Sequence, residues 1–239
     1  MVNAPMRMSW LLLAPLVLTS AALSGCADEQ TESVPPQARE SPQQQVVDKS
    51  RLAVLALRSN EVVGRPVNEE LSKARGVLIF PNLVRAGVIV GAGGGVGVLL
   101  GRIAGGWSDP AFYFSGEGSF GLQIGVEAGQ VMFVIRNDAA LTKIVNGNVN
   151  IGADVSVAIG PFGGGAAGGT TTNLGADLVA FSVQEGIFGG AAFKGGVINP
   201  MLDWNEAYYG PGATPRAIVV ENRFHNPGAL GLKAALAIP

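Results

Sequence analysis

Apolar residues recur at helical spacing near the start of the predicted domain. Residues 46–63, VVDKSRLAVLALRSNEVV, carry an apolar stripe that includes Leu52 and Leu55. Val54 and Leu57 fall on the opposite side of the same helix. A helix that is apolar most of the way round is usually buried. The pattern therefore predicts a helix that packs into a core, and it argues against a helix that lies flat on a membrane.

A second helix is indicated by its start and stop signals. Asn68 is the predicted N-cap, because two glutamates follow it in the first turn. Lys73 and Arg75 fall in the last turn, and Gly76 comes directly after it. Basic residues followed by glycine are typical of a helix C-terminus.

From Val77 onward the apolar period changes from helical to two, which is typical of half-buried antiparallel strands. Alternating strands are predicted at residues 120–127, 149–157 and 178–184. More central strands are predicted from shorter apolar runs at residues 77–80, 111–114 and 130–136. A short helix is predicted after Asn137. The predicted fold class is α+β: a large curved or barrel-like antiparallel β-sheet with N-terminal helices and a few short helices packed on it.

Residues 86–101, AGVIVGAGGGVGVLLG, are uncharged and hold seven glycines. A helix that spans a bilayer needs roughly 20 apolar residues, and each glycine costs a helix about 1 kcal/mol relative to alanine. Glycine inside a strand marks a bulge, a bend or the close approach of another backbone or a ligand. The segment is therefore predicted to form strands of the curved sheet, and not a membrane-spanning helix.

The N-terminus has the features of a bacterial export signal. A positive start precedes an apolar run from Trp10 to Val17, which fades into small residues and ends in Leu23-Ser24-Gly25-Cys26. This ending resembles the bacterial lipobox, in which cleavage precedes the cysteine and diacylglycerol is added to its thiol. Cys26 is the only cysteine of the chain, so it has no internal disulfide partner. We expect a lipoprotein signal peptide at residues 1–25; an ordinary signal peptide followed by a chance cysteine is the alternative.

The residues that follow Cys26 are polar and rich in proline, so residues 26–45 are predicted to be a flexible tether. Residues 46–239 are long enough for one sizeable domain. In bacterial lipoproteins an Asp directly after the lipidated cysteine tends to retain the protein at the inner membrane. Because Ala27 stands there instead, we expect the protein at the outer membrane, on its periplasmic face or at the cell surface.

Charge is distributed unevenly along the chain. Residues 49–102 hold eight Lys and Arg against three Glu, whereas residues 103–239 hold six against ten Asp and Glu. A basic surface of this kind either is a solvated helical face or faces anionic lipid, where each Lys or Arg contributes about 1 kcal/mol. A nucleic-acid partner is not expected of an exported, mildly acidic protein that lacks interleaved aromatic and basic residues.

Glycine motifs give little reason to expect a nucleotide cofactor. Residues 116–121, GEGSFG, match GxGxxG, but a dinucleotide site needs a helix after the motif and here a strand-like sequence follows. Residues 160–175 are glycine-rich and lack GK[ST], so they are predicted to be a loop. No cofactor is expected.

Catalytic and metal-binding residues are equally sparse. His225 is the only histidine, which makes a Ser-His-Asp arrangement or a histidine-based metal site difficult to build. Carboxylates lie on or near the polar faces of predicted strands, where solvent exposure explains them as well as glycoside chemistry does: Glu117, Glu127, Asp154, Asp177 and Glu185. We expect neither enzyme activity nor a metal site.

Five blocks together resemble the SYLF domain, also called the Ysc84 family. They are SKARGVLIFPNLVRAG, GWSDPAFYFSGEGSFGLQIG, GNVNIGADVSVAIGPFG, FSVQEGIFGG and NEAYYG. The resemblance runs in order from about Leu52 to Gly210. It implies phosphoinositide or membrane binding, sometimes with actin binding, as in eukaryotic members, and export as a lipoprotein, as in bacterial ones. Arg85 stands where the family usually has Lys, which keeps the positive charge.

Two functions follow as hypotheses. In the first, an outer-membrane lipoprotein anchored by Cys26 binds the anionic headgroups of membrane phospholipids without catalysis, through a basic cluster around Arg58, Lys73, Arg75 and Arg85. In the second, the domain is an envelope scaffold or protein-interaction module, or a host-facing one that binds actin, and its only lipid contact is the acylated cysteine.

Overall fold

The computed structural model describes residues 40–87, 90–120, 125–161, 175–183 and 196–237. The chain divides into two units, Met1–Arg39 and Glu40–Pro239. The predicted signal peptide, Cys26 and most of the predicted tether therefore lie outside the described residues.

Helices and strands alternate unevenly along the second unit. The helices are α1 (Pro42–Ser59), α2 (Gly64–Lys73), α3 (Asp138–Asn146), α4 (Leu202–Tyr209) and α5 (Leu230–Leu236), with short helical segments η2 (Arg216–Val220) and η3 (Pro227–Ala229). The strands are β1 (Gly76–Gly87), β2 (Val90–Ile103), β3 (Gly106–Trp107), β4 (Ala111–Phe120), β5 (Gly125–Ile135), β6 (Val149–Asn150), β7 (Val157–Ile159), β8 (Leu178–Phe181) and β9 (Val197–Pro200).

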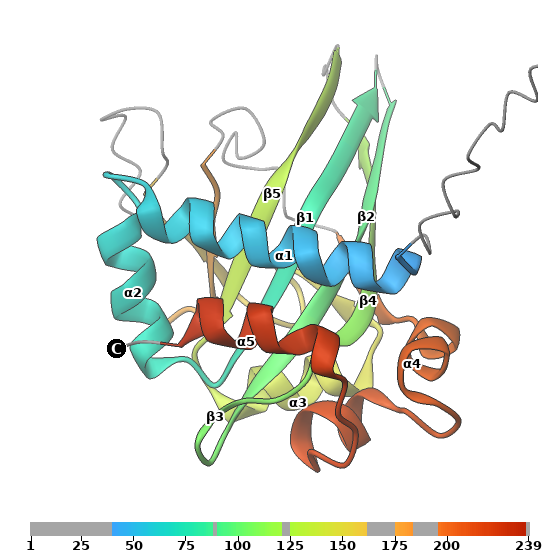
Figure 1. The fold of residues 1–239 in the computed structure, drawn as a ribbon. Helices are drawn as coiled ribbons and strands as arrows, with labels where there is room; N and C mark the ends of the chain where they lie inside the picture. Colours follow the sequence, from blue (N-terminus) through green and yellow to red (C-terminus); the bar gives the residue numbers. More distant parts are fainter. Residues whose placement is uncertain (1–39, 88–89, 121–124, 162–174, 184–195, 238–239) are drawn as a thin grey trace, which may run out of the picture. The chain divides into compact units, whose positions relative to one another are not determined.

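A single sheet joins the strands in the order β6-β9-β4-β2-β1-β5-β8-β7, with β3 paired to β2. All pairs are antiparallel except β7 with β8. The sheet curls into a half-barrel (Figure 1). Its two outermost strands, β6 and β7, are joined by residues 151–156 alone, so the chain itself links the ends of the curl. The predicted α+β class with a curved, mainly antiparallel sheet is confirmed.

Each face of the sheet has its own hydrophobic core, because side chains alternate along every strand. In β1, Val77 and Ile79 pack on the side of α1, α2 and α5, whereas Leu78 and Phe80 pack on the side of α3 and η2. All four are fully buried. Burial of an apolar side chain of this size contributes about 1.5–3 kcal/mol. Figure 1 shows α1, α2 and α5 on one side of the central strands.

The first two helices begin about one turn earlier than the sequence predicts. α1 begins at Pro42, because Ser41 is the N-cap and its Oγ accepts a hydrogen bond from the Gln44 amide at 3.1 Å. α2 begins at Gly64, so the prediction of Asn68 as its N-cap is wrong. The Asn68 side chain instead accepts a hydrogen bond from Arg58 Nε at 2.8 Å. A contact with another helix, which the local sequence does not reveal, thus explains this asparagine.

The central strands and the short helix α3 lie where they were predicted. Residues 77–80 and 111–114 belong to β1 and β4, and residues 130–135 belong to β5. The alternating strand predicted at 178–184 is present as β8, which covers 178–181, and all four of its residues are buried, so the predicted alternation is wrong. α3 begins directly after Asn137, whose side chain caps it. These segments combine apolar runs with clear flanking signals.

Two of the predicted alternating strands are wrong. Phe120 ends β4 and residues 125–127 belong to β5, and β2 and β1 lie between these two strands in the sheet, so 120–127 is not one strand. Residues 149–157 turn at 152–154, where Gly152 has φ +91°. The Asp154 side chain stabilises that turn by accepting a hydrogen bond from the Asn150 amide at 2.8 Å.

The described residues of the glycine-rich segment, 86–87 and 90–101, form the end of β1 and most of β2, as predicted. Its glycines permit close approach to β1, whose pairing shifts at residues 80–83. A Cβ on Gly95 would stand 2.6 Å from the Asn82 carbonyl oxygen, and one on Gly97 would collide with the Ile79 carbonyl oxygen. In the described part of the chain, no helix combines the length and the hydrophobicity that crossing a bilayer requires.

Candidate membrane-binding surface

The outward side of α1 exposes two leucines between two basic residues. Leu52 is 62% exposed and Leu55 is 41% exposed, whereas Val54 and Leu57 are buried against the sheet. At 3.6 residues per turn, Lys49 lies on one flank of the leucines and Arg51 on the other. Both basic residues are exposed. The helix therefore has a buried apolar side and an outward side that carries the two leucines, the two cations and, between the leucines, the half-buried carboxylate of Asp48.

The neighbouring helix α5 extends this surface. Leu230, its first residue, is 62% exposed. The Arg51 side chain passes close to α5, because a Cβ on Gly231 would stand 3.2 Å from Arg51 Cδ. We name Lys49, Arg51, Leu52, Leu55 and Leu230 the α1/α5 face. Asp48, the acidic residue of α1, is half-buried, and its carboxylate accepts a hydrogen bond from Gln44 Nε2 at 3.1 Å.

Arg58, a predicted headgroup ligand, contacts the C-terminal end of α5. Its guanidinium donates hydrogen bonds to the carbonyl oxygens of Ala235 and, at 2.8 Å, Ala237. It also reaches Asn68 of α2. The last carbonyls of a helix lack partners within the helix, so Arg58 satisfies two of them while it links α1, α2 and α5.

The other predicted headgroup ligands are distributed between α2 and β1. Lys73 ends α2 and is exposed. Arg75 follows two residues later, and its Nε lies 3.6 Å from the Asp138 carboxylate, with 55% of the side chain exposed. Arg85 lies on β1, where it pairs in register with Glu127 of β5, and its side chain is outside the described part. Cys26 is outside it as well. Lys73 and Arg75, which are two residues apart in sequence, are thus the two predicted ligands that are exposed in the described part of the chain.

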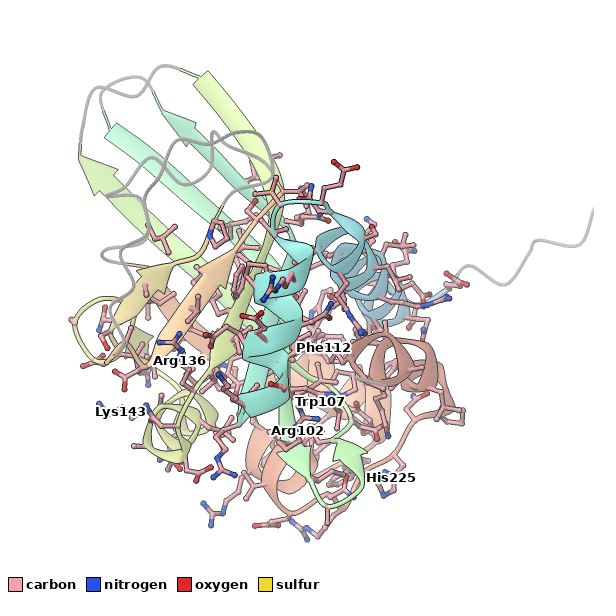
Figure 2. All side chains as sticks on the ribbon, turned by 90° about the vertical axis from the view of Figure 1, so that its left-hand side faces the viewer. Arg102, Trp107, Phe112, Arg136, Lys143 and His225 are labelled. Carbon is pink, nitrogen blue, oxygen red and sulfur yellow. The ribbon has the colours of Figure 1, made fainter. Side chains whose placement is uncertain are left out.

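Two further arginines hold elements together. Arg102 donates a hydrogen bond to the Leu71 carbonyl at the end of α2, at 2.6 Å, and its guanidinium carbon lies 3.9 Å from the ring centre of Trp107 (Figure 2). Burial lowers the pKa of Arg102. Arg136 donates two hydrogen bonds to the Glu70 carboxylate, at 2.8 and 2.6 Å, and this pairing raises the pKa of Arg136. Part of the positive charge noted in the sequence is therefore used inside the fold.

A buried carboxylate lies at the base of α5. Asp109 is 1% exposed and accepts hydrogen bonds from Lys233 Nζ at 2.8 Å and from the Asn226 amide at 2.9 Å. His225 Nδ1 lies 3.2 Å from the same carboxylate, and Figure 2 labels this histidine. Asp109 is more than 100 residues away in sequence from each of these three partners. No local sequence motif therefore indicates the cluster.

Two tyrosines near Asp109 are also engaged in packing. Tyr209 donates a hydrogen bond to the Pro110 carbonyl at 2.7 Å, and burial raises its pKa. Tyr208 donates to the Gln44 side chain at 2.7 Å. Desolvation, aided by the charges of Asp109 and Asp48, raises the pKa of Tyr208 to about 12. Both hydroxyls therefore stay neutral donors at physiological pH.

The described carboxylates of the polar strand faces have structural partners. Asp177 accepts hydrogen bonds from the Ser156 amide and from the Asn137 side chain, and these bonds lower its pKa. Asp154 accepts from the Asn150 amide, which lowers its pKa too. Within the described ranges, no group of three or more His, Cys, Asp or Glu is placed to hold a metal ion.

The remaining chemical motifs lie wholly or partly outside the described residues. Glu185 and most of the predicted loop at 160–175 are among them, as are the side chains of Glu117 and Glu127. The motif GEGSFG lies largely on β4, without a helix directly after it in the described chain.

Sequence comparisons with known proteins all indicate the same family. The family model described as Ysc84, Las17-binding protein actin regulator, matches residues 116–238. The human SH3 domain-containing YSC84-like protein 1 is 29% identical over 142 residues, which is 58% of this chain and 41% of that protein. The protein of the same name from Xenopus laevis is 29% identical over 143 residues, 59% of this chain and 42% of its own length.

The match to a yeast relative covers more of this chain. LAS seventeen-binding protein 3 of Saccharomyces cerevisiae is 28% identical over 165 residues, 67% of this chain and 35% of that protein. The matched part thus spans about two fifths of the length of these relatives. No solved structure matches this chain.

Proposed function

Because this chain belongs to the Ysc84 family, whose model matches residues 116–238, we propose that its folded unit is a non-catalytic module that binds the surface of anionic phospholipid bilayers. The observation that carries the proposal is the α1/α5 face. Apolar side chains flanked by cations are what an interfacial helix presents to a membrane, because the apolar groups enter the acyl boundary and the cations meet the headgroups.

The energetics suit a weak, reversible contact. Each Lys or Arg near an anionic surface contributes about 1 kcal/mol, and each buried CH₂ contributes about 0.8 kcal/mol. Leu52 and Leu55 are already exposed and so need no conformational change to reach lipid. The exposed pair Lys73 and Arg75 is a second candidate contact for headgroups, together with Arg58 and Arg85.

A lipid anchor at Cys26 supplies the attachment in this proposal. The sequence Leu23-Ser24-Gly25-Cys26 supports acylation, and Ala27 supports the outer membrane as its location. The chain between Cys26 and the start of α1 at Pro42 reaches at most about 56 Å, at roughly 3.5 Å per residue. Since α1 is the first described element after the anchor, its outward side can remain within reach of the same bilayer.

Flotation with vesicles tests the headgroup contact. Residues 40–239, without Cys26, should float with phosphatidylglycerol vesicles at low salt and much less with phosphatidylcholine vesicles or at high salt, because screening weakens exposed charge contacts. The double variants Leu52→Gln/Leu55→Gln and Lys49→Glu/Arg51→Glu should each lower flotation.

Matched variants separate the candidate contacts. Leu202→Gln/Val220→Gln removes two exposed apolar side chains, 52% and 49% exposed, from other elements and should leave flotation unchanged. Lys73→Glu/Arg75→Glu measures the second candidate contact. Failure of the unaltered fragment to float at low salt would rule out the proposed function.

A second candidate function is protein interaction. It is favoured by the description of the matching family as Las17-binding and as an actin regulator. In that case the folded unit binds an envelope or host protein, and lipid contact is limited to the anchor. Capture of one defined partner, with an affinity that the α1 variants leave unchanged, would support this function over lipid binding.

A further inference from the structure

The strands β1, β2, β4 and β5 continue past the helices that cover them. Figure 1 shows the ends of β1, β2 and β5 projecting beyond α1. Val84 and Phe114 lie on the face of the sheet that α1 covers elsewhere along these strands. Val84 is 37% exposed and Phe114 is 43% exposed. We name this projecting surface the ledge and define it by Val84, Gly94, Val96, Phe114, Gly116 and Ala128.

Strand register places the ledge residues side by side. Val84 pairs with Gly94 and with Ala128, and Gly94 pairs with Gly116. Val96 pairs with Phe114, two residues along each strand. Alternation along β4 puts Phe114 on the same side as Phe112, which packs in the core beneath α1. The ledge therefore continues that core's surface, and none of the helices that the structure describes covers it.

Glycines keep the Phe114 ring against the sheet. A Cβ on Gly94 would stand 3.1 Å from Phe114 Cζ, and one on Gly116 would stand 3.0 Å from Phe114 Cε1. The ring thus lies over two residues without side chains, with its other side open to solvent. The result is a smooth apolar surface with one aromatic ring across it.

The ledge offers few hydrogen-bonding groups, although alternation along β5 places the half-buried Gln130 next to Ala128 on the same face. Its side chains carry no polar atoms, and its inner strands use their backbone groups in the sheet: Val84 pairs on both sides, and so does Gly94. Protein interfaces form about one hydrogen bond per 100–200 Å². A hydrocarbon chain forms none, so it suits this surface better than a peptide does.

The wall beside the ledge is the flank of α1 that carries Lys49. Arg51 and Arg58 contact α5, so their flank faces that helix and the opposite flank faces away from it. Figure 1 shows α1 between α5 and the projecting strands. An exposed ammonium at the border of an apolar surface complements the negative headgroup of an amphiphile.

We propose that the ledge holds an acyl chain of a membrane phospholipid, an inference that rests on the proposed membrane-surface role. In this arrangement the α1/α5 face meets the headgroup layer, while Phe114 and Val84 contact hydrocarbon from one lipid. The ledge deepens the proposed function by adding a contact with the chain of the lipid to the contact with its head.

Photocrosslinking tests both contacts at once. The full chain is reconstituted into vesicles of phosphatidylglycerol that carries a diazirine on one acyl chain, near the chain end in one sample and next to the headgroup in a second sample, since an interfacial helix lies at the boundary between headgroups and acyl chains. After irradiation, trypsin separates residues 52–58 of α1 from residues 103–136, which contain Phe114. Labelling near residues 114–116 is expected. Phe114→Gln should reduce it roughly fivefold, because a contact of an aromatic ring with hydrocarbon is lost.

Two further variants and one mass measurement complete the test. Val84→Gln should lower the same labelling, and the matched control Val220→Gln should not. Thermal unfolding is measured for both variants and for Phe114→Gln, and labelling is compared between variants whose unfolding midpoints are equal. Labelling confined to residues 52–58 would overturn the ledge and leave the proposed function standing. Absence of labelling at both peptides would overturn both. A dimer in solution that Phe114→Gln dissociates would assign the ledge to a second copy and overturn the lipid proposal.

Discussion

Asp109 contributes to the stability of the fold through the groups that surround its carboxylate. Its carboxylate is buried and held by Lys233, His225 and the Asn226 amide. Removing one partner of a buried ion pair costs about 3–5 kcal/mol, because the other charge stays buried without compensation. Lys233 lies in α5, so the carboxylate also fixes that helix.

We predict that Asp109→Asn lowers the free energy of unfolding by about 3 kcal/mol, since Lys233 keeps its charge and loses its counter-ion. Urea unfolding at neutral pH measures it. The control is Glu69→Gln, which removes an exposed pair with Arg65 and should cost less than about 1 kcal/mol. An Asp109→Asn protein as stable as this control would contradict the assignment.

Asp177 makes stability depend on pH. Hydrogen bonds from Ser156 and Asn137 lower its folded pKa below the unfolded value of about 3.9. Its contribution is therefore present above that value and is lost as the pH falls through the folded pKa. The free energy of unfolding should decrease from about pH 5 to pH 2, and Asp177→Asn should reduce this slope.

The slope is measured by urea unfolding at several pH values. Asp203→Asn, which replaces an exposed carboxylate on α4, should keep the slope of the unaltered protein. An unchanged slope in Asp177→Asn would show that its hydrogen bonds do not favour the charged form.

At the scale of elements, α5 illustrates a short helix held by distant side chains. Arg58 donates to carbonyls at its C-terminus, and Trp107 Nε1 donates to the Leu236 carbonyl at 3.1 Å. A seven-residue helix is marginal in isolation. Its order therefore comes from these contacts and from packing against α1.

We predict that Arg58→Met speeds amide hydrogen exchange across residues 230–237 by roughly tenfold, which corresponds to about 1.4 kcal/mol of lost local stability. Hydrogen exchange with mass spectrometry measures it. Arg65→Met, which removes an exposed arginine from α2, should leave that peptide unchanged. Equal exchange in both variants would mean that Arg58 does not hold α5.

Elements with both a strong apolar run and a clear boundary were predicted well. The helix after Asn137 and the strands at 77–80 and 111–114 are examples. The alternation at 149–157 predicted a strand, but the hydrogen bond from Asn150 to Asp154 and the backbone of Gly152 stabilise a turn. Period-two alternation occurs in any extended segment that has one solvent-exposed face. It therefore does not distinguish one strand from two short strands joined by a turn.

At the scale of the whole molecule, anchoring and surface contact are separate properties. We predict that Cys26→Ser shifts the protein from the membrane pellet to the supernatant after a high-salt wash, because only the exposed α1/α5 contact remains and salt screens it. Fractionation of cells with immunoblotting measures this.

The control for this shift is the unaltered chain, which should stay in the pellet through the same wash. Retention of Cys26→Ser through both high-salt and carbonate washing would contradict an acyl anchor. Either the uncleaved apolar run from Trp10 to Val17 or the folded unit itself would then hold the protein in lipid.

The sequence by itself determined the α+β class and the family resemblance. These depend on local periodicity and composition, which each segment carries alone. The tertiary structure decided which polar side chains remain available to bind other molecules and which are used within the fold. Arg58 and Arg102 belong to the basic segment, yet they cap helices, and the lone His225 reaches Asp109 116 residues away.

The same holds for α1, whose apolar residues on both sides predicted burial. The sheet buries Val54 and Leu57 but is reached from one side only, so Leu52 and Leu55 remain exposed. Exposure depends on what other segments cover, and contacts between segments distant in sequence leave no local pattern. For that reason the candidate membrane surface was decided by packing, while the sequence supplied the residues from which it is built.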